Sequence, residues 1–307
     1  MRGLEEARAF YEAYGREMLH RDFAAYEGRV AVGLAGHGSE CFGFDDELSR
    51  DHDWERGFCL WLSDADDVEI GVALSRAYRA LPIARAGQRG SLSEQNRGVR
   101  RYSDFFRRYT GSPAAPEDWR QWMAIPSHAL AEATNGEVWR DDAGAFTAIR
   151  QTLRHGLPED VRLKKLAARA MEMAQAGQYN YVRCLKHGQE GAAMLAAAAF
   201  VQAACGMIYL LNRAHMPYYK WCFKGMERLT ILGALREALE YLLTGENDEA
   251  GQRTKAGVIE DVSAAVIKEL RAQGLSHGNW DYLEPHAFEI MEHIVNPQIR
   301  ALHVMEG

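Results

Sequence analysis

The pattern of apolar residues changes near residue 143, and this change limits the folds open to the chain. Before it, three short runs are rich in β-branched and apolar residues, at 29–35, 58–62 and 137–141. After it, helical runs divided by glycine or proline lie at about 143–155, 158–176, 190–213, 217–243, 247–273 and 280–304. The order predicts an α+β fold: a small mixed-sheet module at 1–150, then an all-α helical bundle at 151–307.

Two helices are expected in the first module. The apolar and aromatic side chains of residues 4–27 recur at helical spacing. A second helix is expected at 64–81, with Asp64 or Asp66 as its N-cap and Pro82 as its stop. The first 150 residues therefore mix strands with helices, unlike the rest of the chain.

One segment has the length of a membrane span. The run from Gly191 to Leu211 carries no charge, but alanine is its commonest residue and Gln202 and Tyr209 interrupt it. We expect the central helix of a bundle. The N-terminus lacks an apolar signal core, and the five scattered cysteines form no CxxC pair. A cytoplasmic protein with no membrane partner is the expectation.

The residues that carry chemistry follow the first predicted strand. Gly38 and Ser39 end a glycine turn, and Asp51 and Asp53 precede the strand at 58–62. In an extended chain Asp51 and Asp53 project to one face, with His52 on the other. Two neighbouring carboxylates repel unless a cation lies between them, and hard oxygen ligands favour Mg²⁺ or Mn²⁺. The glycine turn and the Ser39 hydroxyl suit a phosphate.

Phosphoryl and nucleotidyl transfer use such a set of groups, and a third carboxylate usually completes it. Asp141, at the end of the strand predicted at 137–141, is the candidate for metal binding and catalysis. Asp142 and Glu137 are the alternatives.

At this point the sequence resembles a known superfamily. A Gly-Ser turn followed twelve positions later by Asp-x-Asp resembles the nucleotidyltransferases with the polymerase-β-like fold. The run GSECFGFDDELSRDHDW, with the later GEVWRDDAGAFTAIR, AGQYNYVRCLKHG and LLNRAHMPYYKW, resembles one uncharacterised bacterial family of that superfamily, domain of unknown function 4037, over most of the chain.

The resemblance implies an N-terminal catalytic module with a C-terminal helical domain, Mg²⁺ and a nucleoside triphosphate such as ATP. Gly38 and Ser39 would contact the phosphates, and Asp51 and Asp53 would bind metal. The segment between Ser39 and Asp51 is itself acidic, with Asp45, Asp46 and Glu47, which leaves a shifted ligand set open.

Polar residues in the helical half are further candidates. Tyr179 is placed to stack on a base or sugar, and Asn180 and Arg183 share a helix face. They are candidates for substrate binding, and the alternative is a hydrogen-bond network between helices.

After the apolar run, Asn212 and Lys220 are candidates for nucleotide binding, since Lys220 would neutralise the leaving pyrophosphate. Tyr218 is a candidate for substrate binding, although aromatics at helical spacing more often form core. Pro217 is expected to start a helix.

A basic stretch precedes the second half. Residues 85–108 hold seven arginines against two acids. We favour a solvated helix face with local ion pairs over a mobile basic element above a triphosphate.

The leading interpretation is a Mg²⁺-dependent nucleotidyltransferase that moves a nucleoside monophosphate to a hydroxyl acceptor and releases pyrophosphate. The alternatives are a metal-dependent phosphohydrolase, suggested by His52-Asp53, and a non-catalytic nucleotide-binding protein that kept the fold. Expected partners are a nucleoside triphosphate and a small-molecule or protein acceptor, for a monomer or homodimer. The net charge of −7 makes long nucleic acid an unfavourable partner. The sequence does not select the acceptor or the base.

Overall fold

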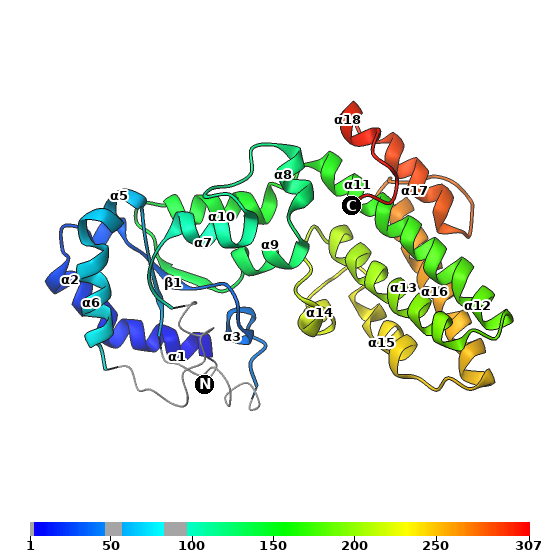
Figure 1. The fold of residues 1–307 in the computed structure, drawn as a ribbon, viewed down its shortest axis with the longest axis horizontal. Helices are drawn as coiled ribbons and strands as arrows, with labels where there is room; N and C mark the ends of the chain where they lie inside the picture. Colours follow the sequence, from blue (N-terminus) through cyan, green and yellow to red (C-terminus); the bar gives the residue numbers. More distant parts are fainter. Residues whose placement is uncertain (1–2, 47–56, 83–96) are drawn as a thin grey trace. The chain divides into compact units, whose positions relative to one another are not determined.

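The computed structural model describes residues 3–46, 57–82 and 97–307, and it divides into two compact units, Met1–Gly156 and Leu157–Gly307 (Figure 1). The first unit holds a four-stranded sheet with helices, and the second is helical. The α+β class predicted from the sequence is confirmed.

The sheet of the first unit is mixed, with strand order β3-β2-β1-β4. Strands β1 (Ala31–Leu34), β2 (Cys59–Leu62) and β4 (Glu137–Arg140) lie where the short apolar runs predict them. β1 is antiparallel to both β2 and β4. Strand β3 (Gly98–Arg101) runs parallel to β2 at the edge of the sheet.

Strand β3 corrects the interpretation of the basic stretch as a helix face. Its sequence, Gly-Val-Arg-Arg, lacks the apolar alternation that marks a half-buried strand, because an edge strand is free to expose charge. Helix α7 (Tyr102–Thr110) follows directly and holds two more of the arginines, Arg107 and Arg108.

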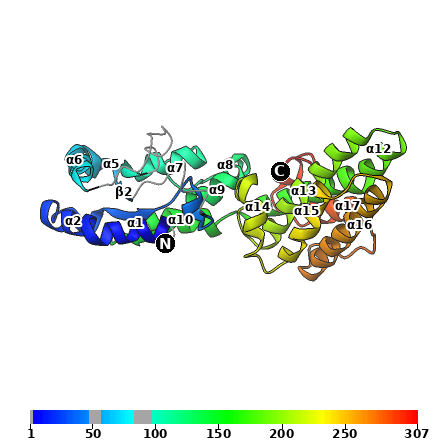
Figure 2. The same cartoon turned by 90° about the horizontal axis from the view of Figure 1, so that it is seen from below.

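Both faces of the sheet are covered. On one face, α1 (Gly3–Phe10), the π-helical turn Tyr11–Gly15 and α2 (Arg16–Asp22) form one continuous rod, visible in Figure 2. Its side chains Phe10 and Leu19 pack with Phe58 and Leu60 of the sheet region. Alternate residues of β2 face the other way, where Trp61 stacks on Phe146 at 4.1 Å between ring centroids.

The remaining elements of the first unit are mostly short helices. They are α3 (Ser39–Phe42), α5 (Asp64–Asp66), the π-helical turn Asp67–Gly71, α6 (Val72–Ala80), α8 (Trp119–Ala124), α9 (Ser127–Thr134) and α10 (Ala145–His155), with a 3-10 turn at Glu27–Arg29. The predicted cap of the helix after β2 is wrong by one residue or more. Ser63 is the N-cap, and its hydroxyl oxygen accepts from the Asp66 backbone N–H at 3.0 Å.

The second unit is built around α11 (Glu159–Met173), which packs against α13 (Glu190–Leu211) and α17 (Leu283–Glu292). The π-helical segment Ala174–Tyr181 and α12 (Val182–Lys186) continue α11. The other elements are α14 (Tyr219–Met226), the 3-10 turn Gly233–Leu235, α15 (Arg236–Thr244), α16 (Glu249–Ala272) and α18 (Pro297–Arg300).

Several predicted helix bounds differ, and the run at 280–304 is divided into α17 and α18. The helical run predicted at 158–176 does not end before Gly177, because the chain is helical through it: a Cβ there would lie 2.3 Å from the Phe200 ring, so the glycine permits close helix packing. The expected helix at 217–243 begins at Tyr219 and is broken near Leu232, whose φ of +56° is incompatible with a right-handed helix.

Helix α13 is the one helix in the described part of the chain that is long and apolar enough to cross a bilayer. In the second unit, 56% of its most apolar window is buried. Its packing against α11 is that of a central bundle helix, as the sequence predicts.

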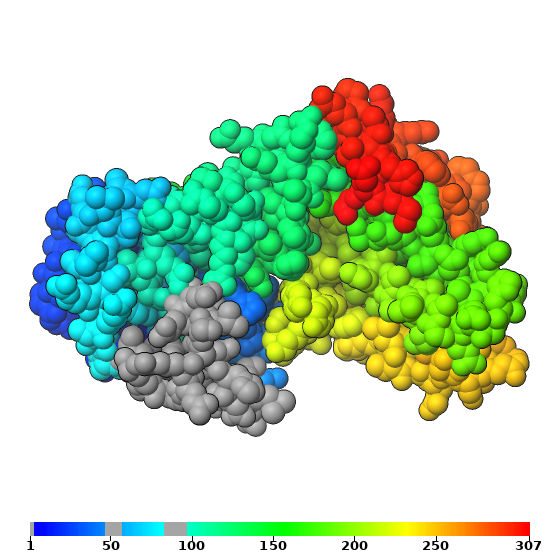
Figure 3. All heavy atoms as spheres, viewed as in Figure 1, coloured from blue at the N-terminus to red at the C-terminus, as the bar shows by residue number. Residues whose placement is uncertain are grey.

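The C-terminal residues lie against α11, as the red and green atoms of Figure 3 show. The buried Lys164 ammonium donates to the backbone carbonyls of Val304, at 3.0 Å, and Glu306. Burial lowers the pKa of Lys164 to about 8. The lysine ties the last described turn to the bundle.

Candidate functional site

One end of the sheet, where the strands start or stop, gathers residues from all four strands. β1 ends there, while β2, β3 and β4 begin there, because Gly33 pairs with Cys59, Cys59 with Gly98, and Leu34 with Glu137. We call this the turn edge, since the glycine turn Gly36–Ser39 follows β1 at this place. Residues about a hundred positions apart in sequence, such as Leu34 and Glu137, therefore meet at the turn edge.

The turn is held by a side chain from the other end of the unit's sequence. The Asn135 Oδ1 atom accepts from the Gly36 backbone N–H at 2.8 Å, and its Nδ2 atom donates to the Gly36 carbonyl at 2.7 Å. Gly36 has φ +112°, a conformation that favours glycine. Gly36 lies outside the paired strands, and the Asn135 side chain bonds both its N–H and its carbonyl.

Buried groups support this clamp. The Arg150 guanidinium is almost fully buried and donates from Nη2 to the Asn135 carbonyl at 2.7 Å and to the Thr134 carbonyl at 3.1 Å. Burial lowers the pKa of Arg150 to about 10. The Tyr109 hydroxyl accepts from the His37 backbone N–H at 3.1 Å. The turn is fixed from α7, α10 and the chain before β4.

His37 itself pairs with an acid. Its Nδ1 atom lies 3.3 Å from Glu132 Oε1 on α9. This hydrogen bond raises the pKa of His37, against the lowering effect of burial. His37 is therefore more readily protonated than a free histidine.

Gly38 and Ser39 lie at the tip of the turn. Gly38 has φ +123° and precedes α3, which begins at Ser39. A Cβ on Gly38 would lie 2.6 Å from Glu40 Oε2, so the Glu40 carboxylate rests against the glycine. That carboxylate accepts from Arg97 Nη2 at 3.1 Å, and both side chains are largely buried. Arg97 thereby offsets the negative charge beside the turn.

Two more arginines reach the turn edge. Arg100 and Arg108 line a small pocket of about 40 Å³ with Asp104, next to Ala35 and Tyr109. Burial raises the pKa of the Cys59 thiol in this pocket to about 11, and nearby Arg100 and Arg97 reduce the effect. Three guanidinium groups thus gather beside Gly36–Ser39, a composition that suits an anion such as phosphate.

The other arginines of the basic stretch behave as solvated ion pairs. Arg101 and Arg107 both pair with Asp104, at 2.7 and 3.1 Å, on the exposed surface. Of the seven arginines counted in the sequence, Arg85 and Arg89 lie outside the described residues. The expected local ion pairs are therefore found at Arg101 and Arg107, although Arg101 lies on β3 and not on a helix, while Arg97, Arg100 and Arg108 lie near the turn edge.

The predicted metal ligands Asp51 and Asp53 lie outside the described residues, as does His52. In sequence, Asp53 stands four positions before Gly57, where the described chain resumes at the turn edge. In the described residues, no group of three or more His, Cys, Asp and Glu side chains could hold a metal ion.

The third carboxylate candidate lies elsewhere. Asp141 follows the far end of β4, four residues from Glu137 and so about 13 Å along the strand from the turn edge. Its Oδ2 atom accepts from the Thr147 backbone N–H at 2.7 Å, which satisfies the first turn of α10. Of the alternatives, Asp142 pairs with Arg140, and Glu137 lies opposite Leu34 at the turn edge.

The candidates on the helical unit fall into two groups. Tyr179, Asn180 and Arg183 are exposed on the continuation of α11, and the Arg183 Nη1 atom donates to the Tyr179 hydroxyl at 3.1 Å. The structure therefore joins Tyr179 and Arg183, and it exposes Asn180 beside them in the chain.

Asn212 plays a structural part. Its amide donates to the carbonyls of Ile208 and Ile231, each at 2.8 Å, and accepts from the Ile231 N–H at 3.0 Å. Lys220 is exposed, with its ammonium 4.9 Å from the Trp221 ring centroid, and Tyr218 packs on Tyr219 at 4.2 Å. The Asn212 amide is therefore committed within the unit, while Lys220 and Tyr218 remain on the surface.

Sequence reasoning missed Asn135, Tyr109 and the individual roles of Arg97 and Arg100. Asn135-Gly136 reads as an ordinary turn signal, and nothing near it in sequence indicates a partner at Gly36. The one available signal was the excess of arginines in the basic stretch.

Comparison with known proteins gives one family. The model of a domain of unknown function (DUF4037) matches residues 122–222, about a third of the chain, from α8 to α14. The match supports the expected likeness to an uncharacterised family, and its description states no activity. No curated protein matches the chain.

Proposed function

We propose that this chain is a metal-dependent nucleotidyltransferase that transfers a nucleoside monophosphate from a nucleoside triphosphate to a hydroxyl acceptor. The observation that carries the proposal is the turn edge, where a clamped glycine turn lies beside three arginines. The described chain resumes at this edge with Gly57, and Asp51 and Asp53 precede Gly57 by six and four positions in the sequence.

Each described group has a role in the proposal. Gly38 has no side chain to block a phosphate oxygen, and Ser39 offers a hydroxyl donor beside it. Arg100 and Arg108 supply positive charge for the triphosphate. Arg97 pairs with Glu40, which limits the repulsion between that carboxylate and the phosphates.

Metal binding is assigned to Asp51 and Asp53 from the sequence pattern and the superfamily resemblance. Bound Mg²⁺ would supply charge neutralisation at the phosphates and position the triphosphate. Lys220 and the surface of Tyr179, Asn180 and Arg183 are proposed contacts of nucleotide or substrate on the helical unit. Asp141 has no role in the proposal, because its carboxylate accepts a hydrogen bond from the Thr147 N–H of α10. It also follows the end of β4 that lies away from the turn edge.

The reaction is an in-line displacement. The acceptor oxygen forms a bond to the α-phosphorus, the bond to the bridging oxygen of the β-phosphate breaks, and pyrophosphate leaves with that electron pair. The acceptor hydroxyl gives up its proton to solvent or a nearby base. The rigid turn and the arginines hold the triphosphate during this exchange.

The test measures pyrophosphate release from a mixture of nucleoside triphosphates with Mg²⁺ and an acceptor extract. Asp51→Asn and Asp53→Asn should each lower release by at least about a hundredfold, as loss of a metal-bound charge does. Asp261→Asn, at an exposed aspartate of α16 with no role in the proposal, is the matched control. Equal activity of all three variants and the wild type would remove the metal assignment.

A second pair of variants tests the anion site. Arg100→Ala should weaken ATP binding measured by calorimetry, while Arg107→Ala, on the surface of α7 and paired with Asp104, should not. If both variants bind ATP like the wild type, the phosphates do not lie at the turn edge.

A further inference from the structure

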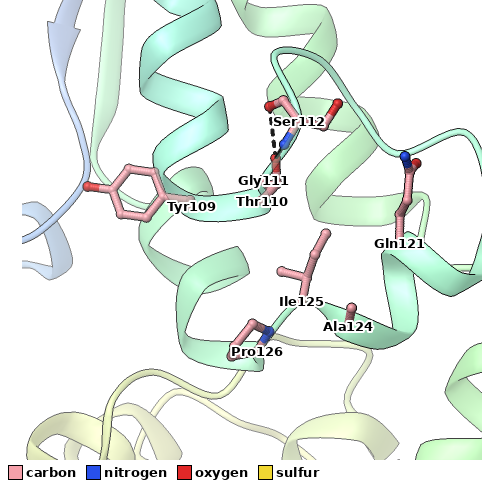
Figure 4. Close-up of a pocket in the computed structure, with 8 residues that line it drawn as sticks. All are labelled: Tyr109, Thr110, Gly111, Ser112, Gln121, Ala124, Ile125 and Pro126. Carbon is pink, nitrogen blue, oxygen red and sulfur yellow. Dashed lines mark hydrogen bonds between the residues drawn. The ribbon is translucent and has the colours of Figure 1, made fainter.

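A second pocket lies on the first unit, beside the turn edge. It has a volume of about 350 Å³ and lies between the C-terminal end of α7, at Tyr109–Ser112, and the connection of α8 to α9, at Ala124–Pro126, with Gln121 on its wall (Figure 4). This size is at the lower end of the range of small-molecule sites.

Tyr109 joins this pocket to the turn. In Figure 4 its ring runs from α7 away from Gln121 and toward the blue chain that follows β1. There its hydroxyl accepts from the His37 N–H at 3.1 Å. The same ring lines the small pocket of Arg100 and Arg108. Tyr109 is therefore common to the described linings of the 350 Å³ pocket and of the pocket that holds Arg100 and Arg108.

The two sides of Tyr109 differ in charge. Arg100, Arg108 and Asp104 line one side, whereas among the described residues no acidic or basic side chain lines the 350 Å³ pocket. Burial raises the pKa of Tyr109, so its hydroxyl is neutral at physiological pH. A charged ligand in the larger pocket would lose hydration without gaining a counter-ion, which is costly.

The lining of the larger pocket suits a neutral polar molecule. Ser112 and Gln121 offer hydroxyl and amide groups, and Ile125 and Pro126 offer an apolar surface. The Gln121 Oε1 atom accepts from the Glu117 N–H at 3.0 Å, before the N-terminus of α8. The Gln121 NH₂ group is therefore directed away from that N-terminus. Neutral hydroxyl compounds use such mixtures of donors and apolar contact.

We propose that the pocket between α7 and the α8–α9 connection binds the acceptor, and that the acceptor is a small uncharged molecule that bears hydroxyl groups. The assignment as acceptor rests on the proposed nucleotidyl transfer. The triphosphate lies on the arginine side of Tyr109 and the acceptor on the neutral side, so the reacting oxygen approaches the turn edge past this ring.

The test compares matched neutral and charged probes by ligand-observed NMR on the full chain. The neutral probes are glucose, myo-inositol and uridine, and their charged counterparts are glucosamine, myo-inositol 1-phosphate and uridine monophosphate. We expect at least one neutral probe to bind in this pocket with a Kd of about 1 mM or tighter, and its charged counterpart to bind in this pocket more weakly.

A filling variant locates the site. Ala124 is exposed at the end of α8, so Ala124→Trp places an indole in the pocket without disturbing the core. Ala73→Trp, at an exposed position of α6, is the matched control. The neutral probe should bind at least about tenfold more weakly to Ala124→Trp and unchanged to Ala73→Trp, while ATP binding is the same in both.

Three results would overturn the proposal: no neutral probe binds, a charged counterpart binds as tightly and also loses affinity in Ala124→Trp, or the two tryptophan variants bind the neutral probe alike. Loss of ATP binding in Ala124→Trp would assign the pocket to the nucleotide and also overturn it. If the neutral probe binds more weakly to Ala124→Trp but no nucleoside triphosphate is consumed with any probe, the pocket is a binding site for neutral molecules. The proposed nucleotidyl transfer is then wrong.

Discussion

Removal of the Asn135 amide should loosen the glycine turn by an amount that the structure lets us estimate. Asn135 makes two hydrogen bonds with Gly36, at 2.8 and 2.7 Å, across 99 residues of sequence. A neutral hydrogen bond contributes about 0.5–1.5 kcal/mol, so Asn135→Ala should lower the free energy of opening the turn by about 1–3 kcal/mol.

Hydrogen exchange measured by mass spectrometry reports this opening directly. The Gly36 amide should exchange about 5–150 times faster in Asn135→Ala, since each 1.4 kcal/mol is a factor of ten. Asn180→Ala is the control, because Asn180 is an exposed asparagine on the helical unit and its removal should leave Gly36 unchanged.

Asn135→Asp separates the two bonds. The aspartate keeps an acceptor for the Gly36 N–H but turns a carboxylate oxygen toward the Gly36 carbonyl, where only a protonated acid can donate. The folded pKa of this aspartate should therefore exceed its unfolded value of about 3.9. Stability relative to wild type should be best below about pH 4 and fall as pH rises through the folded pKa.

The reasoning is refuted if Asn135→Ala and Asn180→Ala leave the Gly36 amide equally protected. It is also refuted if Asn135→Asp shows the same pH dependence as the wild type. Either result would mean that the turn keeps its conformation without the clamp.

Further predictions concern single residues. Gly36→Ala should destabilise the first unit by about 1–3 kcal/mol in urea titration, because φ is +112° and a Cβ would meet the Tyr109 hydroxyl at 2.6 Å; a loss below about 0.5 kcal/mol would contradict the strain. Glu132→Gln should lower the His37 pKa measured by NMR, because the Glu132 hydrogen bond raises it. The pair's contribution to stability should be full below the unfolded pKa of about 6.5 and lost as pH rises through the folded pKa; a His37 titration unchanged in Glu132→Gln would refute the pairing. Asn212→Ala should destabilise the helical unit by about 1–3 kcal/mol without changing ATP affinity, and an effect on affinity alone would restore Asn212 as a nucleotide ligand.

Local patterns predicted most of the elements. The β-branched run at 29–35 became β1, and the apolar run at 190–213 became the central helix α13, because side-chain periodicity is a property of neighbouring residues. Strand β3 was missed because an edge strand tolerates Arg100 and Arg101, so its residues carry no alternation to read. The N-cap of α5 was misplaced because Ser63, Asp64 and Asp66 are all residue types that cap helices, so residue type alone does not choose among them.

The sequence by itself determined the α+β class and the presence of a glycine turn after the first strand. Only the tertiary structure decided what surrounds that turn. Asn135 and Arg97 reach it through strand pairing, whereas Asp141, equally plausible in sequence, is carried to the far end of β4 by the antiparallel register. Register depends on contacts between distant segments, and no local pattern contains it.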